Sequence, residues 1–157
     1  AITDSHIGHF NLLNVISYAS GAQKIKVEVS RRSFGSQYET KSSLGISMLV
    51  MAPADMFAHG LMAMLERVGR TSRDIFDVYF FEKKGWEINK KIVEDRSGMT
   101  FKETLLKCVE TLEKMDNRHI LDGLGELLSE PQKDWVRAKL KEEVIFLLRV
   151  KIDSLEV

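Results

Sequence analysis

The sequence has only one cysteine, two prolines and no long apolar run, and each shortage excludes a class of protein. A single cysteine, Cys108, cannot form a disulfide within the chain and argues against a cysteine-based zinc site. No apolar stretch approaches the roughly 18 residues needed to cross a bilayer, and the first residues lack the basic and then apolar pattern of a signal peptide. We therefore expect a cytoplasmic protein without a membrane segment.

The chain also lacks net charge, because 23 basic and 23 acidic side chains balance. A protein that holds nucleic acid by bulk electrostatics alone carries an excess of positive charge. Any contact with RNA is therefore expected from a local basic patch. With 157 residues, 44% of them apolar and 29% charged, the chain has the composition of one soluble globular domain.

The N-terminal third predicts β-strands. Three strands are expected, over residues 10–18, 24–30 and 44–51. Residues 24–30 alternate between polar and apolar side chains, which is the pattern of a strand with one apolar face. Turn-forming residues at 19–22 predict that the first two strands form an antiparallel hairpin. The third strand is mostly apolar, so we expect it to be buried.

From Pro53 onward the sequence predicts helices. Proline is tolerated at the first helical position, where its missing N–H would have had no partner. Thr71 or Ser72 can cap a helix that runs to about residue 82, and the pair Thr100 and Glu103 forms a capping box before a helix that runs to about residue 115. Further helices are expected over residues 88–95, over residues 119–128, and from residue 130 onward.

These elements predict an α+β fold in a single domain of residues 1–157. A small antiparallel or mixed sheet, over about residues 10–51, is followed by a helical C-terminal portion over about residues 53–155. The number of copies that assemble is left open.

Ionic residues interrupt the apolar helix pattern between residues 67 and 77. Asp74 and Asp77 lie one helical turn apart, and Arg67 and Arg73 lie beside them. Two carboxylates held at the edge of a core beside arginines could meet a metal ion or a phosphate. In a simpler interpretation, Arg73 and Asp77 form a surface ion pair, and the helix macrodipole stabilises Asp74 in the first turn. The residues alone leave both interpretations open.

Several segments, taken in order, resemble one protein family. They are residues 24–32, 44–53 and 57–64, Arg67, the Arg-Asp-Ile-Phe-Asp-Val-Tyr-Phe segment at 73–80, and residues 88–93, 101–103, 134–136 and 143–149. Together they resemble the AbiEii/AbiGii nucleotidyltransferases, which are toxin components of bacterial toxin–antitoxin and phage abortive-infection systems. The resemblance covers nearly all of this chain but only the later part of the family's length.

The resemblance implies a fold and chemistry similar to DNA polymerase β. It implies transfer of a nucleotide from a nucleoside triphosphate to an RNA or protein acceptor, with Mg²⁺ bound by carboxylates and by the phosphates, and a cognate antitoxin as partner. It implies Asp74 and Asp77 as catalytic residues and Arg67 and Arg73 as nucleotide-binding residues. Glu28 matches a third, metal-binding carboxylate on a central strand, although a solvated strand face explains Glu28 equally well.

Two features depart from the family's pattern. The Gly-Gly or Gly-Ser turn followed by Asp-x-Asp has no match in the chain and would lie before its first residue. Gly60 stands where relatives carry a lysine expected to contact the phosphates, and His59 points about 100° away around a helix. Two functions therefore stay open: an AbiEii-like nucleotidyltransferase that is incomplete in this chain, and a catalytically inactive nucleotidyltransferase-like binding or interaction module.

Overall fold

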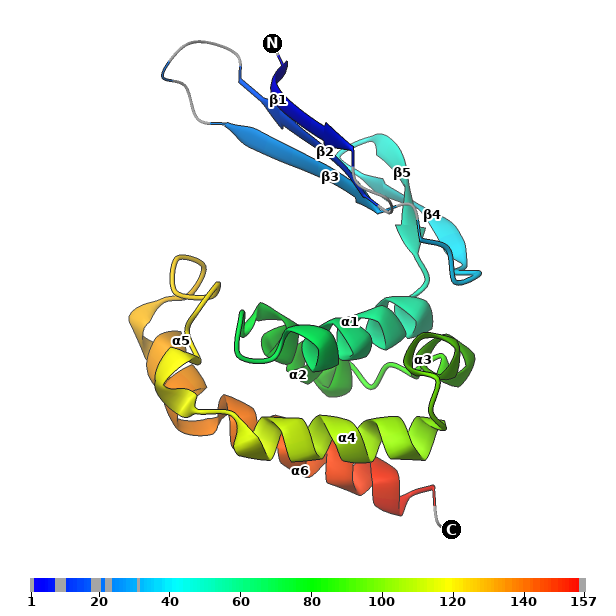
Figure 1. Cartoon of the computed structure of the whole chain (residues 1–157), viewed down its shortest axis with the longest axis vertical. Helices are drawn as coiled ribbons and strands as arrows, with labels where there is room; N and C mark the ends of the chain where they lie inside the picture. The colour runs from blue at the N-terminus through cyan, green and yellow to red at the C-terminus, as the bar shows by residue number, and fades with distance from the viewer. Residues whose placement is uncertain (1, 8–10, 18–20, 22–23, 31, 156–157) are drawn as a thin grey trace. The chain divides into compact units, whose positions relative to one another are not determined.

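A computed structural model of the chain describes residues 2–7, 11–17, 21, 24–30 and 32–155, without the side chains of residues 2–6, 11, 12, 28 and 30. The chain forms two compact units, Ala1–Phe34 and Gly35–Val157. Strands occupy the N-terminal third and helices the remainder, which confirms the α+β class (Figure 1). The single domain over residues 1–157 stays a prediction.

The first unit contains a three-stranded antiparallel sheet of order β1-β2-β3. Its strands are β1 (Ile2–Ile7), β2 (Asn11–Ile16) and β3 (Ile25–Ser30). The antiparallel pairing of β2 with β3 confirms the predicted hairpin, whereas β1 was not predicted. The predicted residues 10, 18–20 and 22 lie outside the described residues.

The second unit begins with a separate antiparallel hairpin of β4 (Tyr38–Ser43) and β5 (Ile46–Met51). Leu44 and Gly45 form its turn, with positive φ values of 51° and 78°. The strand predicted over residues 44–51 is present as β5, but the prediction that it is buried is wrong, because Leu49 is 73% exposed. A mostly apolar strand is typical of a sheet that other elements cover on both faces, whereas β5 belongs to a two-stranded sheet. Strand β4 was not predicted, because its sequence does not alternate between polar and apolar residues.

Helices form the rest of the second unit. They are α1 (Pro53–Arg67), α2 (Arg73–Lys83), α3 (Lys90–Ser97), α4 (Phe101–Lys114), α5 (Glu130–Trp135) and α6 (Lys141–Asp153), with a π-helical segment, Val136–Leu140, between α5 and α6. Helix α1 packs on α2 and α3, and α4 packs along α6 (Figure 1). The core between them is apolar, with no exposed surface at Phe57, Leu61, Ile75, Val78, Leu105 or Leu148.

Local signals fix several helix ends. Thr100 and Glu103 form the predicted capping box, in which Glu103 N donates to Thr100 Oγ1 at 3.3 Å and Thr100 N donates to Glu103 Oε2 at 2.8 Å. The predicted helix over residues 119–128 is wrong: a short 3₁₀ turn, Asn117–His119, is followed by turns. Gly123 has a φ of 79° there, which a right-handed helix cannot contain.

Candidate functional site

The predicted site lies where α1 ends and α2 begins. Arg67 is the last residue of α1, Asp74 lies in the first turn of α2, and residues 68–72 reverse the chain between them. Ser72 fixes this turn, because its backbone N–H donates to Asp122 O at 2.9 Å and its hydroxyl donates to His119 O at 3.3 Å. Residues about fifty positions downstream therefore fix the turn that joins the two helix ends.

Asp74 is buried, with 4% of its surface exposed. Arg67 Nη2 donates to Asp74 Oδ1 at 2.6 Å, whereas Asp74 Oδ2 is buried without a hydrogen-bond partner among the described residues. A buried carboxylate is costly unless it is paired, so Arg67 compensates this charge only in part. The Arg67 side chain is itself 47% exposed. Because a guanidinium carries five N–H donors, Arg67 can hold Asp74 and still contact an anion from solvent.

Asp77 and Arg73 complete the cluster. Burial raises the pKa of the half-buried Asp77, the charge of Asp74 raises it further, and the charges of Arg73 and Arg67 oppose this shift. The structure thus brings Asp74, Asp77, Arg67 and Arg73 into one electrostatic group. Among the described residues the ion pair of this group joins Arg67 to Asp74, and Arg73 acts on Asp77 through its charge without forming an ion pair within 4.0 Å.

Glu28 cannot be assigned to this group. Its backbone pairs with Leu13 in the β2–β3 ladder of the first unit, and its side chain lies outside the described part of the chain. Among the described residues, no three His, Cys, Asp or Glu side chains lie close enough to hold a metal ion. The metal role of Glu28 and the bound Mg²⁺ stay predictions.

Gly60 occupies a crowded position on α1. A Cβ atom at Gly60 would lie 3.0 Å from Cε2 of Phe81. The Phe81 ring cannot move easily, because it stacks on Trp86 at 5.0 Å between centroids and lies 5.4 Å from the ring of Phe57. Where the resemblance predicts a lysine, this chain therefore has close aromatic packing.

The opposite end of α1 holds a second buried carboxylate, Asp55, that the sequence analysis missed. Asp55 is 3% exposed, and both of its oxygens accept hydrogen bonds. Gln37 N donates to Oδ2 and Asn89 Nδ2 donates to Oδ1, each at 2.6 Å. Asp55 thereby joins the start of the β4–β5 hairpin and the N-terminus of α3 to α1. The available signal was an aspartate in the first turn of a helix that begins with proline.

His59 lies beside this junction, with its two ring nitrogens in different roles. Arg96 Nη1 lies 2.8 Å from His59 Nδ1, and a guanidinium can only donate, so Nδ1 accepts. The ring proton is then on Nε2 and is donated to Ser36 Oγ, 2.8 Å away. Burial, followed by the charge of Arg96, lowers the pKa of His59. In this tautomer Nε2 cannot take the Ser36 proton, which excludes a nucleophile–base pair here.

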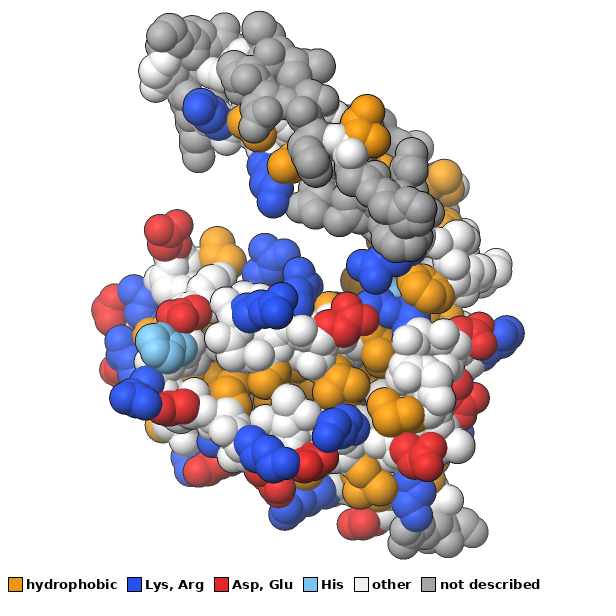
Figure 2. All heavy atoms as spheres, in the orientation of Figure 1, with side chains coloured by type: hydrophobic (Ala, Val, Ile, Leu, Met, Phe, Trp, Pro, Cys, Tyr) orange, Lys and Arg blue, Asp and Glu red, His pale blue; other side chains and the backbone are white. Residues whose placement is uncertain are grey.

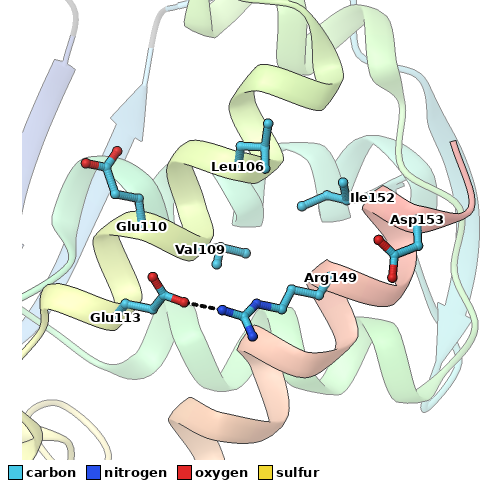
Figure 3. A pocket seen from close by; sticks show the side chains of 7 residues that line it. All are labelled: Leu106, Val109, Glu110, Glu113, Arg149, Ile152 and Asp153. Atoms are coloured by element: carbon cyan, nitrogen blue, oxygen red, sulfur yellow. Dashed lines mark hydrogen bonds and ion pairs between the residues drawn. The ribbon is translucent and has the colours of Figure 1, made fainter. Parts of the chain in front are cut away.

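A groove of about 430 Å³ lies between α4 and α6 (Figure 3). Its apolar floor includes Val109 and Ile152. The acids at its rim are largely neutralised, because Arg149 donates to Glu113 and two lysines of α4 pair with Glu110. No buried polar group points into the groove, so we assign it no ligand.

Comparisons of the chain with protein-family models, with curated proteins and with solved structures found no match. In the part of the chain that the structure describes, no helix combines the length and the apolar character that a membrane crossing requires.

Proposed function

We propose that this chain carries the nucleotide-binding part of a nucleotidyltransferase similar to the AbiEii/AbiGii toxins. The enzyme transfers a nucleotide from a nucleoside triphosphate to an RNA or protein acceptor. One observation supports this function more than any other. The buried carboxylate of Asp74 fixes an arginine, Arg67, whose side chain is still 47% exposed beside Arg73.

The chemistry of nucleotidyl transfer fits such a group. The acceptor oxygen attacks the α-phosphorus, and negative charge develops on the leaving pyrophosphate. Cations that are fixed before the reaction stabilise this charge without reorganising. Arg67 and Arg73 bind the phosphates in this proposal, and Asp74 positions Arg67 through the bond of 2.6 Å. Asp77 lies one turn further along α2, where burial raises the pKa of its carboxyl group, and in this proposal Asp77 exchanges a proton with the reacting groups.

The other expected partners belong to the same proposal. A magnesium ion bound with the triphosphate would neutralise part of the charge of the phosphates. The described residues do not by themselves form a metal site, so no step is assigned to the ion. A cognate antitoxin and an RNA acceptor also follow from the resemblance alone, whereas the cytoplasmic location is expected from the single cysteine and the lack of a signal peptide.

Binding of ATP, GTP, CTP and UTP, measured by isothermal titration calorimetry, tests the site. We expect one of the nucleotides to bind and Arg67→Gln to weaken it about tenfold or more, because a charge-assisted contact to phosphate is lost. Arg149→Gln is the matched control, since Arg149 is also a half-exposed, ion-paired helical arginine. Equal loss of affinity in both variants, or no binding to the wild-type protein, would refute the proposed site.

A catalytically inactive binding module is the second candidate, and the packing at Gly60 favours it. The position of the expected phosphate-contacting lysine is blocked by Phe81, 3.0 Å from a Cβ at Gly60. An inactive module binds a nucleotide at Arg67 but transfers none. Incubation with α-³²P-labelled nucleotides and total RNA separates the two, because only the enzyme leaves label on the acceptor.

A further inference from the structure

Charges are segregated on the surface from Arg67 to Lys84. Every exposed charged residue in this stretch is a cation: Arg67, Arg70, Arg73, Lys83 and Lys84. The three acids of the same stretch, Asp74, Asp77 and Glu82, are buried or partly buried. A chain with no net charge therefore presents a locally basic surface. Figure 2 shows Lys and Arg side chains gathered where α1 meets α2.

Most of these cations are not neutralised. Arg67 pairs with Asp74, but within the described part of the chain no carboxylate forms an ion pair with Arg70, Arg73, Lys83 or Lys84. On α4, by contrast, Lys107 and Lys114 both pair with Glu110. The charges on α2 are thus available to an external anion.

Aromatic rings lie among these cations. Phe80 is 44% exposed, and Lys84 Nζ lies 5.3 Å from the centre of its ring. Lys83 Nζ lies 5.6 Å from the centre of the Tyr79 ring. Arg73, Phe80 and Lys84 recur at spacings of seven and four residues, so they share one face of α2 over roughly 16 Å.

The exposed ring of Phe80 among these cations indicates the class of partner. Phosphate groups neutralise the cations, and unpaired bases stack on aromatic side chains. An acidic polypeptide would satisfy the cations but would gain no stacking on Phe80. We infer that this α2 face, formed by Arg73, Phe80, Lys83 and Lys84, binds single-stranded nucleic acid. Its assignment as the acceptor strand rests on the proposed function, because Arg73 belongs to both surfaces.

Fluorescence anisotropy with a labelled 12-nucleotide single-stranded RNA, at several salt concentrations, tests this face. Each phosphate contact contributes about 0.7 to the slope of log affinity against log salt. We expect the double variant Lys83→Gln/Lys84→Gln to reduce that slope by about 1.4. Phe80→Leu should weaken binding on the order of tenfold with an unchanged slope, because it removes stacking but no charge.

The matched control is the double variant Lys90→Gln/Lys139→Gln. It also removes two exposed cations, of which Lys90 lies 5.6 Å from the ring centre of Phe101. An equal reduction of the slope in this control, or unchanged affinity in Phe80→Leu, overturns the inference. Polyglutamate that displaces RNA equally from the wild type and from Phe80→Leu also overturns it, in favour of an acidic polypeptide. Circular dichroism melting confirms that each variant is folded.

The same variants separate this inference from the proposed function. Nucleotide affinity should be unchanged in Lys83→Gln/Lys84→Gln, because neither lysine belongs to the Arg67 site. RNA binding that maps to α2 in a protein without nucleotide binding would refute the proposed function and leave the nucleic-acid surface standing. Nucleotide binding at Arg67 without RNA binding on α2 would do the reverse.

Discussion

Helix α1 buries a carboxylate beside each of its ends, and the two carboxylates are satisfied differently. At the N-terminal end, Asp55 accepts one hydrogen bond on each oxygen, both from uncharged donors at 2.6 Å. At the C-terminal end, Asp74 accepts from Arg67 on one oxygen, and its other oxygen has no partner among the described residues. The hydrogen bonds of Asp55 join neighbouring elements of the fold. Asp74, in contrast, keeps a buried charge that is only partly compensated, and its cation is half exposed.

An unpartnered buried oxygen does not by itself mark a binding site. Glu82 also has one, on Oε1, and burial raises its pKa. Its cation, Lys151, lies 3.4 Å away and is only 25% exposed, whereas Arg67 is 47% exposed. The difference between Asp55 and Asp74 therefore matters because the cation that holds Asp74 is open to a ligand. Substitutions at both ends of α1 test this difference.

The largest effect on stability is expected from Asp55→Ala. This change leaves Asn89 Nδ2 and Gln37 N without their acceptors and creates a small cavity at a position that is 3% exposed. We expect the free energy of unfolding to fall by about 3 kcal/mol, since two hydrogen bonds to a charged group are lost and each contributes about 1.5–3 kcal/mol. Urea denaturation followed by circular dichroism measures it.

Asp95→Ala is the control for this prediction. Asp95 accepts from Lys91 in an exposed i,i+4 pair, and such pairs contribute about 0.3–0.5 kcal/mol. A loss in Asp55→Ala as small as that of the control would mean that the junction at the N-terminal end of α1 does not support the fold.

The sequence predicted those features that depend on neighbours in the chain. Pro53 marks the start of α1 and Thr100 with Glu103 the start of α4, because each signal acts within a few residues. Asp55 could not be assigned, because its partners Gln37 and Asn89 are 18 and 34 positions away. Spacing alone does not say which distant donors a folded chain brings to a carboxylate.

The candidate site was predicted in part for the same reason. The one-turn spacing of Asp74 and Asp77 is local, so their common position on α2 could be predicted. The partner of Asp74 was not predictable in this way, since Arg67 lies on another helix and reaches it only through the turn at residues 68–72. The sequence favoured Arg73 with Asp77 in its simpler interpretation, because an i,i+4 pair needs no tertiary structure.

A moderate, pH-dependent effect is expected from His59 at the N-terminal end of α1. Ser36, Asp55, Glu66 and Arg96 face the ring, and burial and Arg96 together lower its pKa below the ordinary value near 6.5. The unfolded chain therefore takes up a proton at a higher pH than the folded chain. Stability should fall as the pH drops from about 6.5 towards the folded pKa, by at most about 1.4 kcal/mol per pH unit.

Urea denaturation of the wild type and of His59→Gln between pH 5 and pH 8 measures this effect. Glutamine cannot titrate, so the difference between the two curves isolates His59 from the other histidines. We expect the variant to lose less stability on acidification than the wild type. Parallel curves would show that the Arg96–His59–Ser36 chain of hydrogen bonds does not constrain the protonation of the ring.

The smallest change in stability, and the largest change in function, is expected from Asp74→Ala. Removing this carboxylate eliminates a buried charge with an unpartnered oxygen, and Arg67, already 47% exposed, can take water in its place. These opposing effects should hold the free energy of unfolding within about 1 kcal/mol of the wild type. In a protein that also carries the Asp-x-Asp motif, labelling of RNA by radiolabelled nucleotide should nevertheless be abolished, because Arg67 is no longer fixed. If Asp74→Ala instead unfolds the protein as readily as Asp55→Ala does, both ends of α1 are structural junctions, and the arginine beside Asp74 serves the fold.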